Sequence, residues 1–220
     1  MNPIRLEAKR FLYSLWMLPA TVMVMAGLIW FVYRTGVYPR QQEPTVCLAL
    51  LLSTVEYHIL LYCVLAAAIM GVDVNSGIPR LETLAGGSPL RFLQRKAILY
   101  IIAVLICELL YIAVPLLMWG VSPGPLWRLL PARLFLYLGI GMPFFMLQAV
   151  LPSLQAMLIG DAAAAILWIG LFDDDLNTWY LALLGHQGLP GNWFLYAALS
   201  IVLSVLICFV VFPLKQSTHN

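Results

Sequence analysis

Long runs of apolar residues, separated by short polar stretches, are the feature that most constrains this chain of 220 residues. Several runs reach the roughly 20 residues that a helix needs to cross the hydrocarbon core of a bilayer. Hydrophobic residues make up 63% of the sequence and charged residues only 10%, against about 45–50% and 25% in soluble domains. So few charges cannot cover so much apolar surface in water, whereas lipid solvates it. The sequence therefore predicts one all-α transmembrane domain over residues 1–220.

Six apolar runs are long enough, or nearly long enough, to form transmembrane helices. We place them at residues 14–33, 46–71, 97–119, 133–154, 156–172 and 192–214. The fourth and fifth runs are separated only by a short step near Gln155, and the Ile-Gly-Asp at 159–161 is an alternative position for the turn. A topology with five crossings leaves one run too long for a single crossing. We therefore expect a polytopic protein with six transmembrane helices.

Lysine and arginine lie mostly on one side of this predicted topology. If both termini are cytoplasmic, that side holds eight basic residues, which are Arg5, Lys9, Arg10, Arg80, Arg91, Arg95, Lys96 and Lys215. The outer side then holds four, which are Arg34, Arg40, Arg128 and Arg133. Cytoplasmic loops carry an excess of basic residues in membrane proteins. The distribution therefore favours cytoplasmic N- and C-termini, with the loop between the second and third spans also in the cytoplasm.

The N-terminal segment, residues 1–13, has the pattern of an amphipathic helix. Ile4, Ala8 and Phe11 fall on one helical face, and basic residues occupy much of the rest. A basic amphipathic helix of this kind lies in the headgroup region of a membrane. The alternative is a charged lead-in that only orients the first span.

The segment at residues 173–191, between the last two predicted spans, is unusually apolar for an outer loop. Trp179, Tyr180 and Leu181 precede a turn-rich His-Gln-Gly-Leu-Pro-Gly. One interpretation is a re-entrant segment, which enters the membrane and returns because protein packs around its ends. The other is an aromatic belt at the headgroups, with Trp179 and Trp193 as its members. We expect the re-entrant segment.

A polar island at residues 72–96 interrupts the apolar runs near the middle of the chain. It holds six charged residues, three glycines and two prolines. Pro79 is suited to the first turn of a short helix, Gly86 to its end, and Ser88 to the cap of a second helical piece that begins at Pro89. A short helix held just below the bilayer by two spans can transmit movement from a soluble partner. The alternative is an ordinary cytoplasmic loop whose basic residues anchor it to the membrane.

The order of special residues in this island resembles a known pattern. An acidic-Gly-Glu-Leu-Pro-Lys series is formed by Asp73, Gly77, Glu82, Leu84, Pro89 and Lys96. Together with the amphipathic N-terminus, six spans and the re-entrant segment, this series resembles the permease subunits of ABC transporters in the type-two exporter superfamily. The chain departs from that pattern in its spacing, and Pro79 stands between the Gly and the Glu.

The resemblance implies a permease subunit of an ABC exporter in the cytoplasmic membrane of a bacterium. Two copies, or this chain and a related permease, would pair to enclose the path among membrane lipids, with no nucleic-acid partner. A separate ATPase subunit would dock on the coupling segment 72–96, at Asp73, Gly77, Arg80, Glu82, Leu84, Pro89 and Lys96. The chain has no GxxxxGK[ST] loop to cradle phosphates. ATP would therefore be bound and hydrolysed by the partner, and this chain would be no enzyme and hold no cofactor.

Four polar residues lie inside predicted spans: Glu56, His58, Glu108 and Gln148. With a rise of about 1.5 Å per residue, Glu56 and Glu108 fall near the middle of the bilayer. An ionised carboxylate there costs about 2.5–3.5 kcal/mol, so each must face protein or water, or be protonated. One interpretation places them on a substrate path or proton relay. The other uses them as hydrogen bonds between helices, with Gln148, Ser53, Thr54 or Tyr111 as partners.

Two other functions fit the same composition. A membrane-embedded hydrolase using Glu56 and His58 would need a metal site, but the HExxH pattern is absent and no third ligand is evident. An accessory subunit that stabilises another transporter would share the topology of a permease. Only the proteins with which the chain associates would separate that subunit from a permease.

Overall fold

The structure is a computed structural model, and it describes residues 17–32, 44–53, 55–119, 126–151, 154–171 and 175–217. Within these ranges every regular element is a helix and no strand occurs. The all-α fold predicted from composition is therefore confirmed for this part of the chain. The predicted N-terminal helix at 1–13 lies outside the described residues.

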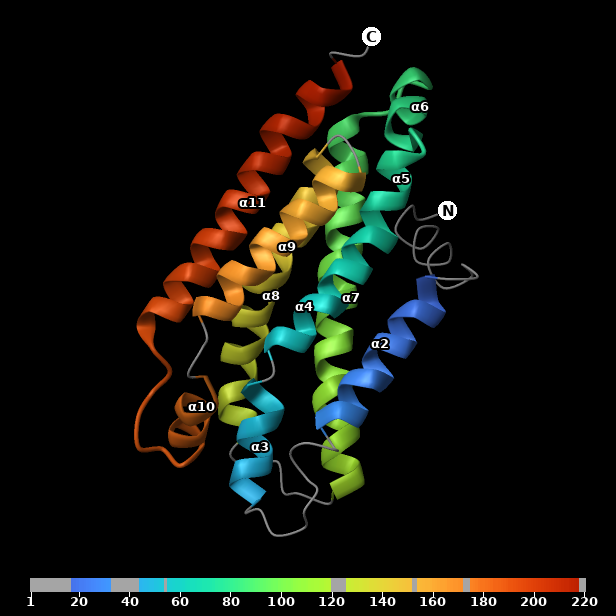
Figure 1. Ribbon diagram of the computed structural model, residues 1–220. Helices are drawn as coiled ribbons and strands as arrows, with labels where there is room; N and C mark the ends of the chain where they lie inside the picture. The colour runs from blue at the N-terminus through green and yellow to red at the C-terminus, as the bar shows by residue number, and fades with distance from the viewer. Residues whose placement is uncertain are drawn as a thin grey trace.

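The helices pack into an elongated bundle, in which α7, α8 and α11 run lengthwise (Figure 1). In chain order the elements are α2 (Met17–Val32), α3 (Pro44–Ser53), α4 (Val55–Ala66), the π-helix η2 (Ala67–Gly71), α5 (Val72–Asn75), α6 (Ile78–Leu84), α7 (Pro89–Trp119), α8 (Leu126–Val150), α9 (Leu154–Leu171), α10 (Asp175–Leu183) and α11 (Gly191–Ser217). The short helix α6 and the end of α11 lie at one end of the bundle, whereas α3 and α10 lie at the other.

Four helical stretches within the described ranges are long and apolar enough to cross a membrane. They are His58–Asn75, Pro89–Ala113, Leu126–Val150 and Gly191–Leu214. Two shorter apolar helices, Pro19–Trp30 and Ala156–Leu171, correspond to the first and fifth predicted spans. The chain therefore has the helices of a membrane protein, and a count of six crossings stays a prediction.

Three details of the predicted spans differ from the structure. The second span, expected as one helix over 46–71, is divided into α3, α4 and η2. Helix α8 begins at Leu126 and not at 133, so that Arg133 lies inside the helix and not at its outer end. The alternative turn at 159–161 is wrong, because α9 continues from Leu154 to Leu171.

The segment predicted to be re-entrant, 173–191, contains α10, which packs against α3. The side chain of Trp179 is buried there, with its ring centroid 6.2 Å from that of Trp193 at the start of α11. The turn that follows passes through Gly185, whose φ of 75° favours glycine. The depth of this segment in a membrane stays a prediction.

Helices α8 and α11 approach each other closely through small residues. A Cβ atom built on Gly139 would lie 2.6 Å from both Cα and Cβ of Ala197. One turn along α11, the hydroxyl of Ser200 donates a hydrogen bond of 2.7 Å to the carbonyl oxygen of Gly139. Small residues that allow close backbone approach are typical of helix pairs in membranes. Gly139 therefore sets the distance between these helices.

We expect the Gly139→Leu substitution to destabilise the protein by about 1–3 kcal/mol, because the added side chain must push α11 away. Gly170→Leu is the matched control, since nothing lies within 4 Å of a Cβ built at Gly170 of α9. The midpoint of thermal unfolding in detergent measures the difference between the two variants. Equal midpoints would contradict the close contact of α8 with α11.

Candidate functional site

The polar island forms a short helix at one end of the bundle, α6, between α5 and α7 (Figure 1). Gly77 precedes α6 in the left-handed conformation, with φ 72°, and Pro79 lies in the first turn. After the helix, Gly86 has φ 85°. Both glycines occupy backbone conformations that other residues rarely adopt. The bounds of α6 therefore follow from local residues, and Pro89 begins α7 as its first residue.

Two ion pairs within the island join α5 and α6 to the start of α7. The Nζ atom of Lys96 lies 2.6 Å from Oδ2 of Asp73 in α5, and both side chains are almost fully buried. Arg95 forms an ion pair with Glu82 of α6, and both of these side chains are partly exposed. A buried pair is costly to break, because each charge would lose its partner away from water. The pairs therefore hold α5, α6 and the first turns of α7 in one arrangement.

The free side of α6 is apolar and exposed. Leu81 is 62% exposed and Leu84 is 69% exposed, and the two are three residues apart on one face of the helix. Arg80 is exposed as well. Among the residues predicted for coupling, Asp73, Glu82 and Lys96 form ion pairs, whereas Leu84 and Arg80 face outwards. The sequence pattern did not reveal that Arg95 would pair with Glu82.

A second cluster lies inside the bundle, around the carboxylate of Glu108 in α7. The Nδ1 atom of His58 in α4 lies 2.5 Å from Oε1 of Glu108, and the hydroxyl of Tyr62 donates to the same oxygen. Arg133 of α8 donates from Nη1 to Oε2. All four residues are completely buried. Three helices, α4, α7 and α8, therefore meet at one carboxylate.

The guanidinium of Arg133 has further partners in the same cluster. Its Cζ atom lies 3.9 Å from the ring centroid of Tyr137 and 5.5 Å from that of Tyr111. Its Nε atom donates to the carbonyl oxygen of Leu52 at 3.4 Å, and the Tyr137 hydroxyl donates to that oxygen at 2.8 Å. Cation–π contacts and charge-assisted hydrogen bonds compensate a buried charge. The cluster therefore compensates the charges of Glu108 and Arg133 inside an apolar bundle.

The other polar residues named for the spans have the following contacts among the described residues. Gln148 does not serve the Glu108 cluster but donates to Oδ2 of Asp161 in α9 at 3.0 Å. Ser53 donates to the carbonyl oxygen of Leu50 at 3.3 Å. The rings of Tyr111 and His58 form a T-shaped pair, with centroids 4.3 Å apart. The side chain of Glu56 lies outside the described residues.

Arg133 is the functional candidate that the sequence analysis missed. The predicted fourth span begins at Arg133 and counts it among the outer basic residues, but Leu126, Leu129 and Leu130 already belong to α8. An arginine that follows a full turn of leucines, with a lone glutamate in the preceding span, is a signal of an ion pair between helices. Arg133 should therefore not be counted among the loop charges that orient the chain.

A third polar contact lies beside the π-helix. The Gln148 side chain occupies the space that a Cβ on Gly71 would fill, at the end of η2. The Oδ1 atom of Asp161 is buried and has no hydrogen-bond partner among the described residues. π-Helical turns inside α-helices are frequent at functional sites. This contact joins η2, α8 and α9 at a distance from the Glu108 cluster.

The hydrolase alternative requires that a substrate can reach the side chain of His58. Its Nδ1 atom faces Glu108, its Nε2 atom lies 3.4 Å from Nη2 of Arg133, and the side chain has no exposed surface. Among the described residues, no group of three or more His, Cys, Asp and Glu side chains could hold a metal ion. His58 is thus engaged by the cluster and is not open to a substrate.

No protein-family model, curated protein or solved structure matches the chain.

Proposed function

We propose that this chain is the membrane-spanning permease subunit of an ATP-driven ABC exporter. The observation that carries the proposal is α6, a short braced helix at the end of an apolar bundle, which presents Leu81 and Leu84 to the outside. Exposed apolar side chains beside a charged residue such as Arg80 are typical of a surface that a protein partner covers. The partner in this proposal is a separate ATPase subunit.

The two ion pairs of the island supply a route for movement. A displacement of α6 by the ATPase would act on α7 through Glu82 and Arg95, and on α5 through the backbone. The buried pair of Asp73 with Lys96 keeps α5 against α7 during that displacement. ATP binding to the partner would then shift the permease between two states by its different contacts with α6 in each.

The Glu108 cluster fits a structural role in this mechanism. It joins α4, α7 and α8 through residues with no exposed surface, and each charge has a partner. We infer that it passes a displacement of α7 on to its neighbours. This supports the interpretation in which Glu108 forms hydrogen bonds between helices, in preference to the one that places it on a substrate path.

The rest of the proposal concerns topology and assembly. Counting α2 and α9 as the first and fifth crossings gives six, with α6 and both termini in the cytoplasm of a bacterium. A second copy, or a related permease, would complete the path, and ATP would be held by the partner alone. The apolar composition of α2 and α9 supports this count.

Purification of the tagged chain from its own membranes tests the proposal. We expect an ATPase subunit to co-purify, and we expect its rate of ATP hydrolysis to rise when the permease is present in vesicles. The accessory-subunit alternative predicts a complex that also contains separate permease chains. Absence of any nucleotide hydrolase from the purified complex would contradict the proposal.

A further inference from the structure

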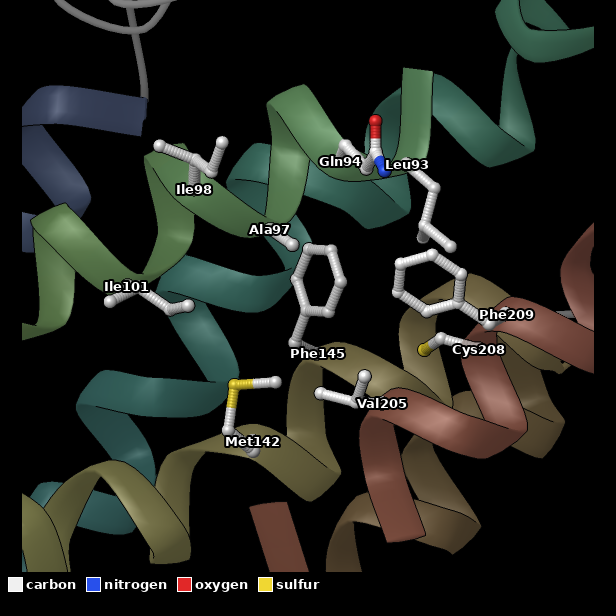
Figure 2. A pocket seen from close by; sticks show the side chains of 10 residues that line it. All are labelled: Leu93, Gln94, Ala97, Ile98, Ile101, Met142, Phe145, Val205, Cys208 and Phe209. Carbon is white, nitrogen blue, oxygen red and sulfur yellow. The ribbon is translucent and has the colours of Figure 1, made fainter. Parts of the chain in front are cut away.

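A groove of about 300 Å³ lies between α7, α8 and α11, in the half of the bundle that is nearer to α6. Figure 2 shows Ala97 and Ile101 of α7 and Met142 and Phe145 of α8 beside Val205 and Phe209 of α11. Its volume is at the lower end of the range for ligand sites in proteins, about 300–1,000 Å³. The walls are apolar except for one residue, Gln94.

The groove opens to the outside of the bundle. Ile98 is 43% exposed and Phe209 is 41% exposed, although both line the groove. Both residues lie on helices that are long and apolar enough to cross a membrane. In a bilayer this opening faces lipid and not water, so the molecules nearest to it are phospholipids.

A polar and a basic residue lie at and beside the end of the groove that is nearer to α6. Gln94 is exposed, and Arg91 is three residues before it on the same face of α7, which continues through Ile98 and Ile101. Both polar residues lie within two turns of the N-terminal end of α7, where the helix dipole favours anions. An apolar groove with a basic residue beside one end suits an anionic phospholipid, whose acyl chains are apolar and whose headgroup is negative.

The charge of Arg91 is free to meet such a headgroup. Three basic residues lie at the start of α7, and two of them are neutralised, since Arg95 pairs with Glu82 and Lys96 with Asp73. No ion pair of Arg91 occurs among the described residues, and its side chain is exposed. Basic pockets between transmembrane helices bind the headgroups of anionic lipids.

We propose that the groove between α7, α8 and α11 binds a phospholipid with an anionic headgroup. One acyl chain lies along the apolar walls, and the phosphate end contacts Arg91 and Gln94. The proposal does not depend on the proposed export function.

Photolabelling in vesicles tests this proposal. The purified protein is placed in vesicles of phosphatidylcholine and phosphatidylglycerol in equal amounts, with a trace of either lipid carrying a diazirine on one acyl chain. We expect phosphatidylglycerol to label the peptides that contain Ile98, Ile101 and Phe209 several-fold more than phosphatidylcholine does. Equal labelling by the two lipids would overturn the proposal.

Two variants sharpen the experiment. Arg91→Gln should lower labelling by phosphatidylglycerol about fivefold, as expected for one basic residue at an anionic surface, and leave labelling by phosphatidylcholine unchanged. Arg128→Gln is the matched control, because Arg128 is also exposed but lies near the other end of the bundle, at the start of α8. An equal loss in both variants would show a general effect of charge and overturn the site.

The apolar part of the groove has its own test. Ala97→Phe fills the space beside Phe145 and should lower labelling of these peptides by both lipids. Elution of the variant as a single species in detergent shows that it is folded. If the labelled peptides instead cross-link to a second copy of the chain, that copy covers the groove and the proposal is wrong.

Discussion

The Glu108→Gln substitution is expected to lower the free energy of unfolding by about 3–5 kcal/mol, because it leaves the buried charge of Arg133 without its anion. Glutamine keeps the size of the side chain, so the change isolates the loss of charge. Neither residue has any exposed surface, so water cannot replace the missing partner. Unfolding in mixed micelles, by titration with a denaturing detergent, measures the free energy.

A double variant separates the ion pair from general damage to the cluster. Replacing both charges, with Glu108→Leu and Arg133→Met, should cost less than the sum of the two single substitutions, because no buried charge remains. Glu82→Gln is the control, since its partly exposed pair with Arg95 contributes about 1 kcal/mol or less. Strictly additive losses in the double variant, or wild-type stability of Glu108→Gln, would contradict the structure of the cluster.

The second large effect is expected at the free face of α6. Changing Leu81 and Leu84 to aspartate should weaken binding of the ATPase subunit by at least about 100-fold, because burying two leucines contributes about 3 kcal/mol. Both side chains are more than half exposed in this structure, so the bundle itself loses little packing. Retention of the ATPase by the tagged variant during purification measures the loss.

The matched control for this face is Leu184→Asp. Leu184 is 42% exposed and follows α10, at the end of the bundle away from α6. This variant should retain the ATPase as well as the unchanged chain does. If the Leu81 and Leu84 variant also retains it while remaining folded, α6 is not the docking element.

The features of the fold that could be predicted from sequence are those determined by neighbouring residues. The apolar runs predicted an all-α membrane protein, because lipid is the only solvent for so much apolar surface. The position of α6 followed from Pro79 at its start and Gly86 after its end, which act through the local backbone. Both predictions rest on interactions within a few residues.

The cluster around Glu108 could not be predicted, because its members come from three helices. The pairing of Glu108 with Arg133 depends on how α7 and α8 pack, and a single sequence does not give that register. The same cause produced the wrong start of α8. In the sequence alone, Arg133 marks one end of an apolar run. In the structure a buried carboxylate pairs with Arg133, so α8 extends to both sides of this residue.

The wide turn of η2 has a mechanical consequence. It lies between α4, which holds His58 in the Glu108 cluster, and α5, which leads to α6. A π-turn carries one residue more than the α-helix needs, and restoring α-geometry would rotate all that follows by about 100°. Such a rotation would turn Asp73 of α5 away from Lys96, so the π-turn at η2 fixes the rotational setting of the island relative to the Glu108 cluster.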